Sequence, residues 1–234
     1  MPGHDKYRLT YFPAEGRAEL IRLIFHAARV PFVDRRITFS DWKDLKPKTP
    51  NGSLPVLEID NQAFDESGAI VMWATRKFGL MGKSDAEELK TTAIIIQANE
   101  FRDKYLLPVF LEKDPVKVEG LKSDMAEGLK TLFGRWEPTV IQTESNHFKT
   151  FSYMITHSLT AADLAVLYLA DLAAKLMDID WKRFPRLAAV LRTVRAVPML
   201  KEYLTARDGT KARITVHTQT EWKADGERCS VVDG

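Results

Sequence analysis

Few residues of this chain have the types and spacing that a catalytic or metal-binding site requires. Cys229 is the only cysteine, and the five histidines are scattered without the spacing of metal ligands. We therefore expect no intrachain disulfide, no metal site and no cysteine redox pair. Tyr11 stands out because it lies at the carboxyl end of a predicted strand. A phenol stays protonated up to a pKa of about 10 and can donate a short hydrogen bond to an anion. The alternative is a core or edge aromatic.

Two short motifs accompany this tyrosine. Glu66 and Ser67 precede a predicted helix, whose free backbone N–H groups attract an anionic group. The Ser67 hydroxyl can donate to such a group or cap the helix. Thr160 and Asp163 have the spacing of a capping box, so we predict that their role is structural.

The first third of the chain alternates strand and helix patterns. Aromatic and β-branched runs predict strands, and apolar residues at helical spacing predict the helices between them. The order βαβ followed by ββα is typical of a thioredoxin-like domain. The predicted elements are strands over 7–12 and 32–39 joined by a helix bearing Ile21, Ile24, Phe25 and Ala28, strands over 54–59 and 62–64, and a helix over 67–78.

The pattern changes at residues 79–84, where two glycines interrupt it. From residue 85 to about residue 206 the chain is expected to be helical, with prolines marking ends or kinks. The fold class is thus α/β plus all-α: a thioredoxin-like domain over 1–82, a helical domain over 83–208 and a polar tail over 209–234. Residues 213–217 could form a short strand within that tail. The helices are predicted over 94–101, 118–133, 161–177 and 184–203.

Composition narrows the class of protein. Hydrophobic residues make up 45% and charged residues 28%, and the net charge is +2. This composition is typical of a globular protein, and the absence of a long basic run argues against a nucleic-acid partner. The N-terminus lacks the pattern of a signal peptide, and no stretch is apolar enough for a membrane span. One cysteine suits a reducing compartment, so we predict a cytoplasmic protein.

Four stretches in order carry a family resemblance. They are YFPAEGRAELIR, FSDWKDLKPKTPNGSLPVLEID, the tripeptide Glu66-Ser67-Gly68 and SLTAADLAV. Together they resemble the soluble glutathione transferases, and the YF, GRAE and DW-x-x-LK elements are similar to the sigma class. The resemblance spans roughly residues 6–207. It implies a homodimeric enzyme that conjugates glutathione to small hydrophobic electrophiles, with glutathione as co-substrate and no cofactor.

The resemblance implies that Tyr11 activates the glutathione thiol and that Arg17 favours the anionic sulfur. A free thiol has a pKa of about 8.5, and the thiolate is the nucleophile. Lowering that pKa by two units needs only about 2.7 kcal/mol, within reach of charge-assisted hydrogen bonds. From spacing alone, Arg17 could equally be a surface arginine at a helix start.

The resemblance also implies the residues that bind the tripeptide. Trp42 and Lys46 would contact the glycyl end, and the backbone of Leu54, before a cis-proline, would pair with the cysteinyl backbone. Trp42 could instead anchor a loop, and Lys46 could be a solvated charge. Glu66 would bind the γ-glutamyl ammonium, and Glu100 would reach the same ammonium across the dimer unless it is a solvated helix-face residue. The full predicted glutathione site is Tyr11, Arg17, Trp42, Lys46, Gly52, Ser53, Leu54, Pro55, Glu66, Ser67 and Glu100.

The sequence departs from the family pattern at several positions. Glu66 replaces the glutamine of close sigma relatives, and Thr156 replaces a glycine before the capping box. Asn51 stands where several classes carry an aromatic key, so we expect a dimer interface without a hydrophobic lock. Glu15 and Leu107 replace an arginine and a tryptophan of the prostaglandin D synthase branch, and prostaglandin isomerisation is not assigned.

Two other functions compete with an enzyme. The segment DRRITFSDW is similar to the lens S-crystallins, which are inactive sigma relatives, and a binding protein for hydrophobic ligands is the other alternative. Retention of Tyr11, Arg17, Trp42 and Lys46 favours the enzyme. The electrophile site is not readable, with Phe12 and Tyr105 as candidates, and peroxidase activity is left open. Cys229 is expected to be an idle thiol in the tail.

Overall fold

The computed structural model describes residues 6–144 and 150–211, and its contacts divide the chain into two units. In the described part, unit 1 holds residues 6–74 and 198–211, and unit 2 holds residues 75–197 around the gap. The division falls inside α3 (Ser67–Lys77). The last helix, α9 (Pro198–Lys211), groups with unit 1 although its sequence follows the helical run. The possible strand over 213–217 and Cys229 lie outside the described residues.

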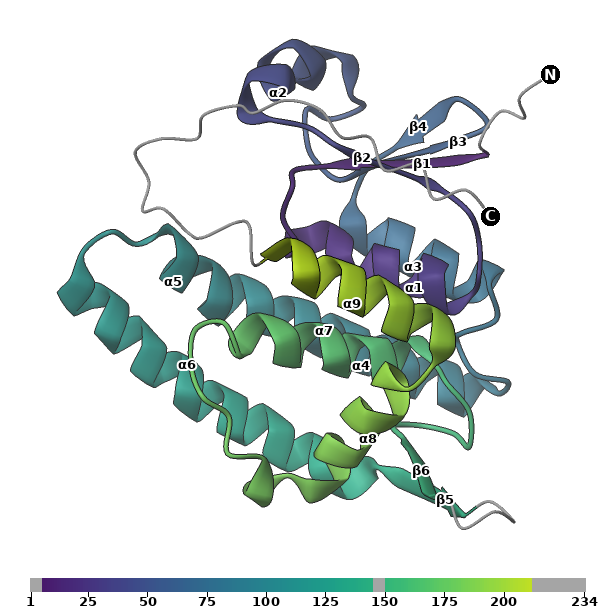
Figure 1. The fold of residues 1–234 in the computed structure, drawn as a ribbon, viewed down its shortest axis with the longest axis vertical. Helices are drawn as coiled ribbons and strands as arrows, with labels where there is room; N and C mark the ends of the chain where they lie inside the picture. The colour runs from purple at the N-terminus through teal and green to yellow at the C-terminus, as the bar shows by residue number, and fades with distance from the viewer. Residues whose placement is uncertain (1–5, 145–149, 212–234) are drawn as a thin grey trace. The chain divides into compact units, whose positions relative to one another are not determined.

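Unit 1 contains the thioredoxin-like sheet that the sequence predicts. Its strands have the order β2-β1-β3-β4, with β1 and β2 parallel and the other pairs antiparallel. In Figure 1, α1 and α3 cover the same face of this sheet. The buried residues of α1 are apolar except for Glu19 and Arg22. The elements are β1 (Tyr7–Tyr11), η1 (Gly16–Ala18), α1 (Glu19–Ala27), β2 (Val33–Arg36), β3 (Val56–Ile59) and β4 (Gln62–Phe64).

The second strand is shorter than predicted because a helix follows it directly. β2 ends at Arg36, and α2 (Phe39–Leu45) begins where a continuing strand was expected. Thr38 and Asp41 form a capping box at its start: the Asp41 N–H donates to the Thr38 hydroxyl, and Asp41 accepts the Thr38 N–H at 2.8 Å. The capping box gives hydrogen-bond partners to backbone N–H groups of the first helical turn, which have none within the helix. It therefore favours a helix at the place where the strand was expected to continue.

Unit 2 is built around α7 (Ala161–Ala173), whose residues are buried at nearly every position. It packs against α4 and α8, which gives the unit a central apolar helix. The predicted helix over 184–203 is instead two helices, because the chain turns before Pro198 and starts α9 there. The other elements are α4 (Asp85–Phe101), η3 (Arg102–Leu106), α5 (Leu107–Leu111), α6 (Pro115–Trp136), η4 (Glu137–Thr139), η5 (Trp181–Arg183) and α8 (Pro185–Arg195).

A β-hairpin in unit 2 corrects the expectation of an all-helical second half. β5 (Ile141–Glu144) pairs antiparallel with β6 (Thr150–Tyr153). The Ser152 N–H donates to the Thr193 hydroxyl at 3.1 Å, which fixes the hairpin to α8. Alternating β-branched and aromatic residues explain why this segment forms strands.

The capping box before α7 is confirmed. Asp163 is fully buried and accepts N–H bonds from Thr160 and Met154, both at 2.7 Å. The nearby turn closes without the family's glycine, because the Thr156 hydroxyl accepts the Ser158 N–H at 2.9 Å. Of the helices in the two described stretches, none combines the length and the apolar character needed to cross a bilayer.

Candidate active site

One end of the unit 1 sheet collects most of the predicted site residues. Tyr11 is the last residue of β1, and its carbonyl accepts the Ile37 N–H at 3.0 Å. Because Thr10 pairs with Val56, the next residue outward on the antiparallel neighbour is Pro55. Because Leu57 pairs with Phe64, Glu66 also follows its strand at this end. The register therefore brings Tyr11, Pro55 and Glu66 to a single edge.

The Tyr11 hydroxyl is fixed from the loop that follows β1. The backbone N–H of Arg17 donates to the Tyr11 oxygen over 3.2 Å. Gly16 has a φ of +39°, and a Cβ at this position would lie 2.5 Å from the same oxygen. Only glycine fits both the left-handed backbone and this close approach. The hydroxyl thus accepts a bond from the loop, and its own hydrogen is left to donate to a ligand.

A buried arginine that sequence reasoning missed supports this loop. Arg22 is fully buried on α1, and its guanidinium carbon lies 5.9 Å from the centre of the Tyr11 ring. It donates to the Ala14 carbonyl at 2.9 Å and to Asp34 at 3.1 Å. Burial alone would lower the pKa of Arg22, but the charges of Asp34 and Glu19 outweigh burial and hold the pKa above its usual value. The only sequence signal was a charge on the apolar face of a helix.

The predicted glycyl-end residues lie on one continuous segment. Trp42 is in α2, and Lys46 begins η2 (Lys46–Lys48). Gly52 has a φ of +65°, and the Lys46 side chain passes 3.5 Å from the place where a Cβ would stand. The Leu54–Pro55 peptide bond is cis, as the resemblance implies. Lys46 and Gly52 therefore lie close together in this segment, and their roles toward glutathione stay predictions.

Asp65, which sequence reasoning missed, holds this loop by hydrogen bonds although it lies 14 positions along the chain from Asn51. Its carboxylate accepts the backbone N–H of Asn51 at 3.0 Å and the Asn51 side-chain amide at 2.8 Å. It also accepts the Ser53 hydroxyl at 3.1 Å. The Ser53 hydroxyl thus donates within the protein, and its predicted place in the glutathione site stays a prediction. The available signal was an acidic residue directly before the Glu66-Ser67 pair.

Glu66 adopts a conformation that is rare for a residue with a side chain. Its φ is +64°, and its carbonyl accepts the Ile70 N–H at 3.0 Å as the first bond of α3. Non-glycine residues in this region cost free energy and concentrate at functional sites. Ser67, the first residue of α3, lies where helix N–H groups have no partner within the helix. The predicted roles of Glu66 and Ser67 toward the γ-glutamyl group stay predictions.

The structure does not bring every predicted residue to this edge. Glu100 is exposed on α4 in unit 2, and its predicted role across a dimer stays a prediction. Phe12 stacks on Phe39 with ring centres 4.5 Å apart in unit 1. Tyr105 packs against Phe101 at 4.8 Å in unit 2.

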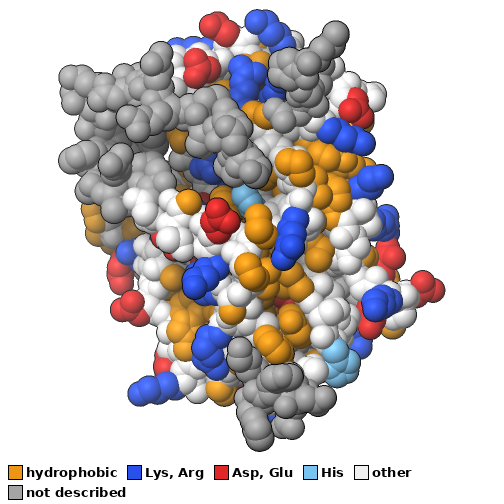
Figure 2. All heavy atoms as spheres, turned by 45° about the vertical axis from the view of Figure 1, so that its right-hand side comes forward, with side chains coloured by type: hydrophobic (Ala, Val, Ile, Leu, Met, Phe, Trp, Pro, Cys, Tyr) orange, Lys and Arg blue, Asp and Glu red, His pale blue; other side chains and the backbone are white. Residues whose placement is uncertain are grey.

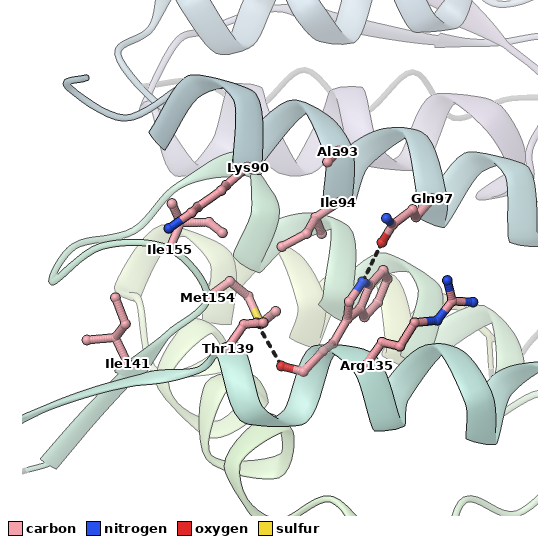
Figure 3. A pocket seen from close by; sticks show the side chains of 10 residues that line it. Lys90, Ala93, Ile94, Gln97, Arg135, Thr139, Ile141, Met154 and Ile155 are labelled. Atoms are coloured by element: carbon pink, nitrogen blue, oxygen red, sulfur yellow. Dashed lines mark hydrogen bonds between the residues drawn. The ribbon is translucent and has the colours of Figure 1, made fainter. Parts of the chain in front are cut away.

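Unit 2 has a cavity of its own, with a volume of about 400 Å³ (Figure 3). The Trp136 indole N–H donates to Gln97 at 2.7 Å in its wall. No residue of the predicted glutathione site lines this cavity. On the face drawn in Figure 2, acidic and basic side chains are interspersed with hydrophobic ones. The cavity is lined by residues of α4, of the end of α6, of η4, of the first residue of β5 and of the segment after β6: Lys90, Ala93, Ile94, Gln97, Arg135, Trp136, Thr139, Ile141, Met154 and Ile155.

Two separate regions of the chain match known protein families. The family described as glutathione S-transferase, N-terminal domain, matches residues 17–83. The glutathione S-transferase C-terminal domain matches residues 99–207. The second match ends inside α9, so it includes most of the helix that belongs to unit 1.

Individual relatives agree over nearly their full length. The chain is 34% identical to glutathione S-transferase 1 of Ascaris suum, covering 88% of this chain and 98% of the relative. It is 30% identical to the mouse hematopoietic prostaglandin D synthase over 88% of this chain and 98% of that protein. The crystal structure of a monomeric glutathione S-transferase from the hookworm Necator americanus is 32% identical, with a TM-score of 0.73 over 86% of this chain and 97% of that one. The chain therefore belongs to the glutathione S-transferase family.

Proposed function

We propose that this chain conjugates glutathione to small hydrophobic electrophiles in the manner of the sigma class, with Tyr11 stabilising the thiolate. One observation carries the proposal. Tyr11 is the last residue of β1, and its hydroxyl oxygen accepts the Arg17 N–H, so the hydroxyl hydrogen can be donated to sulfur. A charge-assisted O–H···S⁻ bond favours the thiolate over the thiol. The buried Arg22 places positive charge 5.9 Å from the Tyr11 ring, and the Arg17 side chain would add to it.

The other residues at the sheet end suit the remaining groups of the tripeptide. Lys46 and Trp42 would bind the glycyl carboxylate, and the Leu54 backbone would pair with the cysteinyl backbone as an added strand. Glu66 would bind the γ-glutamyl ammonium, and the Ser67 hydroxyl with the start of α3 would bind its carboxylate. Glutathione is the co-substrate in this scheme, and no further cofactor takes part.

The chemical step is a nucleophilic displacement. The thiol proton leaves to solvent, and the thiolate forms a C–S bond to the electrophilic carbon. With chlorodinitrobenzene as the electrophile, the C–Cl bond breaks and chloride departs with the electron pair. The protein contributes orientation of the thiolate and a lower thiol pKa.

Conjugation kinetics with chlorodinitrobenzene, together with calorimetric titration of glutathione, test this function. Rates that saturate with glutathione are expected. Glutathione binding without turnover would favour a ligand-binding protein, and a lack of both would favour the crystallin-like alternative. Prostaglandin isomerisation is not proposed, because Glu15 and Leu107 replace residues of that branch.

A homodimer with a polar interface is also part of the proposal. Asn51, at the position of the aromatic key, is held by Asp65 within its own loop and offers no hydrophobic lock. Charge pairs across a polar interface are screened by salt. Sedimentation should therefore show a dimer that dissociates more at high ionic strength. A monomer at all micromolar concentrations, like the hookworm relative, would reject the dimer and the role of Glu100.

A further inference from the structure

Buried charged side chains join α9 to α1 within unit 1. Glu19 accepts hydrogen bonds from the Tyr203 hydroxyl at 2.9 Å and from Arg207 at 2.8 Å. Arg22 donates to the same carboxylate at 3.2 Å. The Arg207 side chain is 6% exposed, and its Nε also lies 3.7 Å from the Glu15 carboxylate. Residues 188 positions apart thus share one water-poor cluster.

The inner part of this cluster is balanced in charge. Two buried carboxylates, Glu15 and Glu19, face two buried guanidinium groups, Arg22 and Arg207. A buried charge without a partner costs several kcal/mol, so removing either arginine leaves a costly negative charge. Arg22 also pairs with Asp34, and Arg207 also pairs with Asp208, whose side chain is half-exposed. Arg207 is the arginine that lies near both buried glutamates from α9.

The cluster is continuous with the loop that fixes the Tyr11 hydroxyl. Glu15 directly precedes Gly16, whose missing side chain makes room for that hydroxyl. Arg22 donates to the Ala14 carbonyl at 2.9 Å while its guanidinium faces the Tyr11 ring at 5.9 Å. Charge at Glu15 or Glu19 is therefore felt by the arginine that stands beside Tyr11.

We propose that Arg207 is a positioning residue for thiol activation, acting as the counter-ion of Glu15 and Glu19. By neutralising these carboxylates, Arg207 leaves more of the positive charge of Arg22 to act on the anionic sulfur at Tyr11. The link runs through Arg22, which lies 3.2 Å from Glu19 and 5.9 Å from the centre of the Tyr11 ring, and burial reduces the screening of these charges. The inference rests on the proposed function, because it concerns the glutathione thiolate at Tyr11.

Other charged and titratable groups surround the cluster and must be held constant in a test. Burial lowers the pKa of His26, which stacks on Tyr203 with ring centres 4.2 Å apart. Burial and Glu19 raise the pKa of Tyr203, so this phenol stays neutral throughout the working range. Other charged groups of the described residues that lie near the cluster or Tyr11 include Arg17, Asp34, Arg36, Glu202 and Asp208.

The test measures the pH at which half of the enzyme-bound glutathione thiol is ionised. The ultraviolet absorbance of the thiolate reports this midpoint. For Arg207→Met the midpoint should rise by about one pH unit, which means about tenfold less thiolate below the midpoint. Arg207→Lys keeps the charge and should stay close to wild type. The double variant Glu15→Gln/Arg207→Met also removes the negative charge of Glu15, so its midpoint should lie close to that of wild type. Arg195→Met, which removes the ion pair with Asp171 in unit 2, is the matched control.

The outcomes separate this inference from the proposed function. A wild-type protein that shows no thiolate signal would contradict the function itself. A wild type with a signal, but a folded Arg207→Met variant with the same midpoint, would overturn the counter-ion role. Failure of the double variant to restore the midpoint would also overturn it. If Arg207→Met does not fold, Glu15→Gln alone decides: a lowered midpoint supports the role, and an unchanged one contradicts it.

Discussion

The backbone N–H of Arg17 lies 3.2 Å from the hydroxyl oxygen of Tyr11 and donates to it. This bond occupies a lone pair of the phenol and leaves the O–H hydrogen as the group available to a ligand. It also stabilises negative charge that shifts onto the phenolic oxygen when Tyr11 donates to an anion. The activating role proposed for Tyr11 therefore depends on the loop over residues 12–17 as much as on the phenol.

Gly16→Ala should disrupt this relationship. The new Cβ would stand 2.5 Å from the Tyr11 oxygen, at a φ of +39°. We expect conjugation to fall at least about tenfold and unfolding free energy to drop by about 1–3 kcal/mol. Thermal unfolding and steady-state kinetics measure both. Gly134→Ala is the control, because nothing lies within 4 Å of its Cβ position on α6, and this variant should keep full activity.

Glu66→Ala should act on binding more than on turnover. Loss of a charge-assisted bond to the substrate ammonium is worth about 1.5–3 kcal/mol, which predicts a KM for glutathione raised by about 10- to 100-fold. Glu119→Ala, an exposed glutamate on α6, controls for the loss of one carboxylate. Equal KM values for Glu66→Ala and wild type would remove Glu66 from the site.

Much of the site was predictable because its parts are local. Tyr11 ends β1, Leu54 and Pro55 directly precede β3, and Glu66-Ser67 stand at the start of α3, so each position follows from a short pattern. α2 was missed because the apolar residues around Thr38 suggested a longer strand, and its capping box was overlooked. Asp65 reaches Asn51 across 14 positions and Arg207 reaches Glu19 across 188, and no periodic pattern encodes such contacts. The hairpin strands of four residues were too short to stand out within a helical region.

Asp163 gives the stability of the fold a definite pH dependence. Burial raises the pKa of this carboxyl from 3.8 to about 6, against the hydrogen bonds that favour its charged form. Between about pH 4 and pH 6 the native state therefore binds more protons than the unfolded state. Its contribution to the free energy of unfolding should fall as pH rises through this range, by at most about 1.36 kcal/mol per unit.

Urea unfolding at several pH values measures that slope. Asp163→Asn should be less stable than wild type because it weakens the cap, and it should lack this part of the slope. Asp85→Asn, exposed at the start of α4, should keep the wild-type slope. Parallel pH curves for wild type and Asp163→Asn would show that Asp163 does not titrate in this range.

The most direct test of Tyr11 is the comparison of turnover and glutathione affinity in Tyr11→Phe. The substitution keeps the ring, which packs beside Phe12 with centres 5.7 Å apart, and removes only the hydroxyl. If the hydroxyl stabilises the thiolate, turnover with chlorodinitrobenzene should fall by about one to two decades while the calorimetric Kd for glutathione changes little. Turnover equal to wild type in a folded Tyr11→Phe protein that binds glutathione would contradict this account and assign thiol activation to another residue.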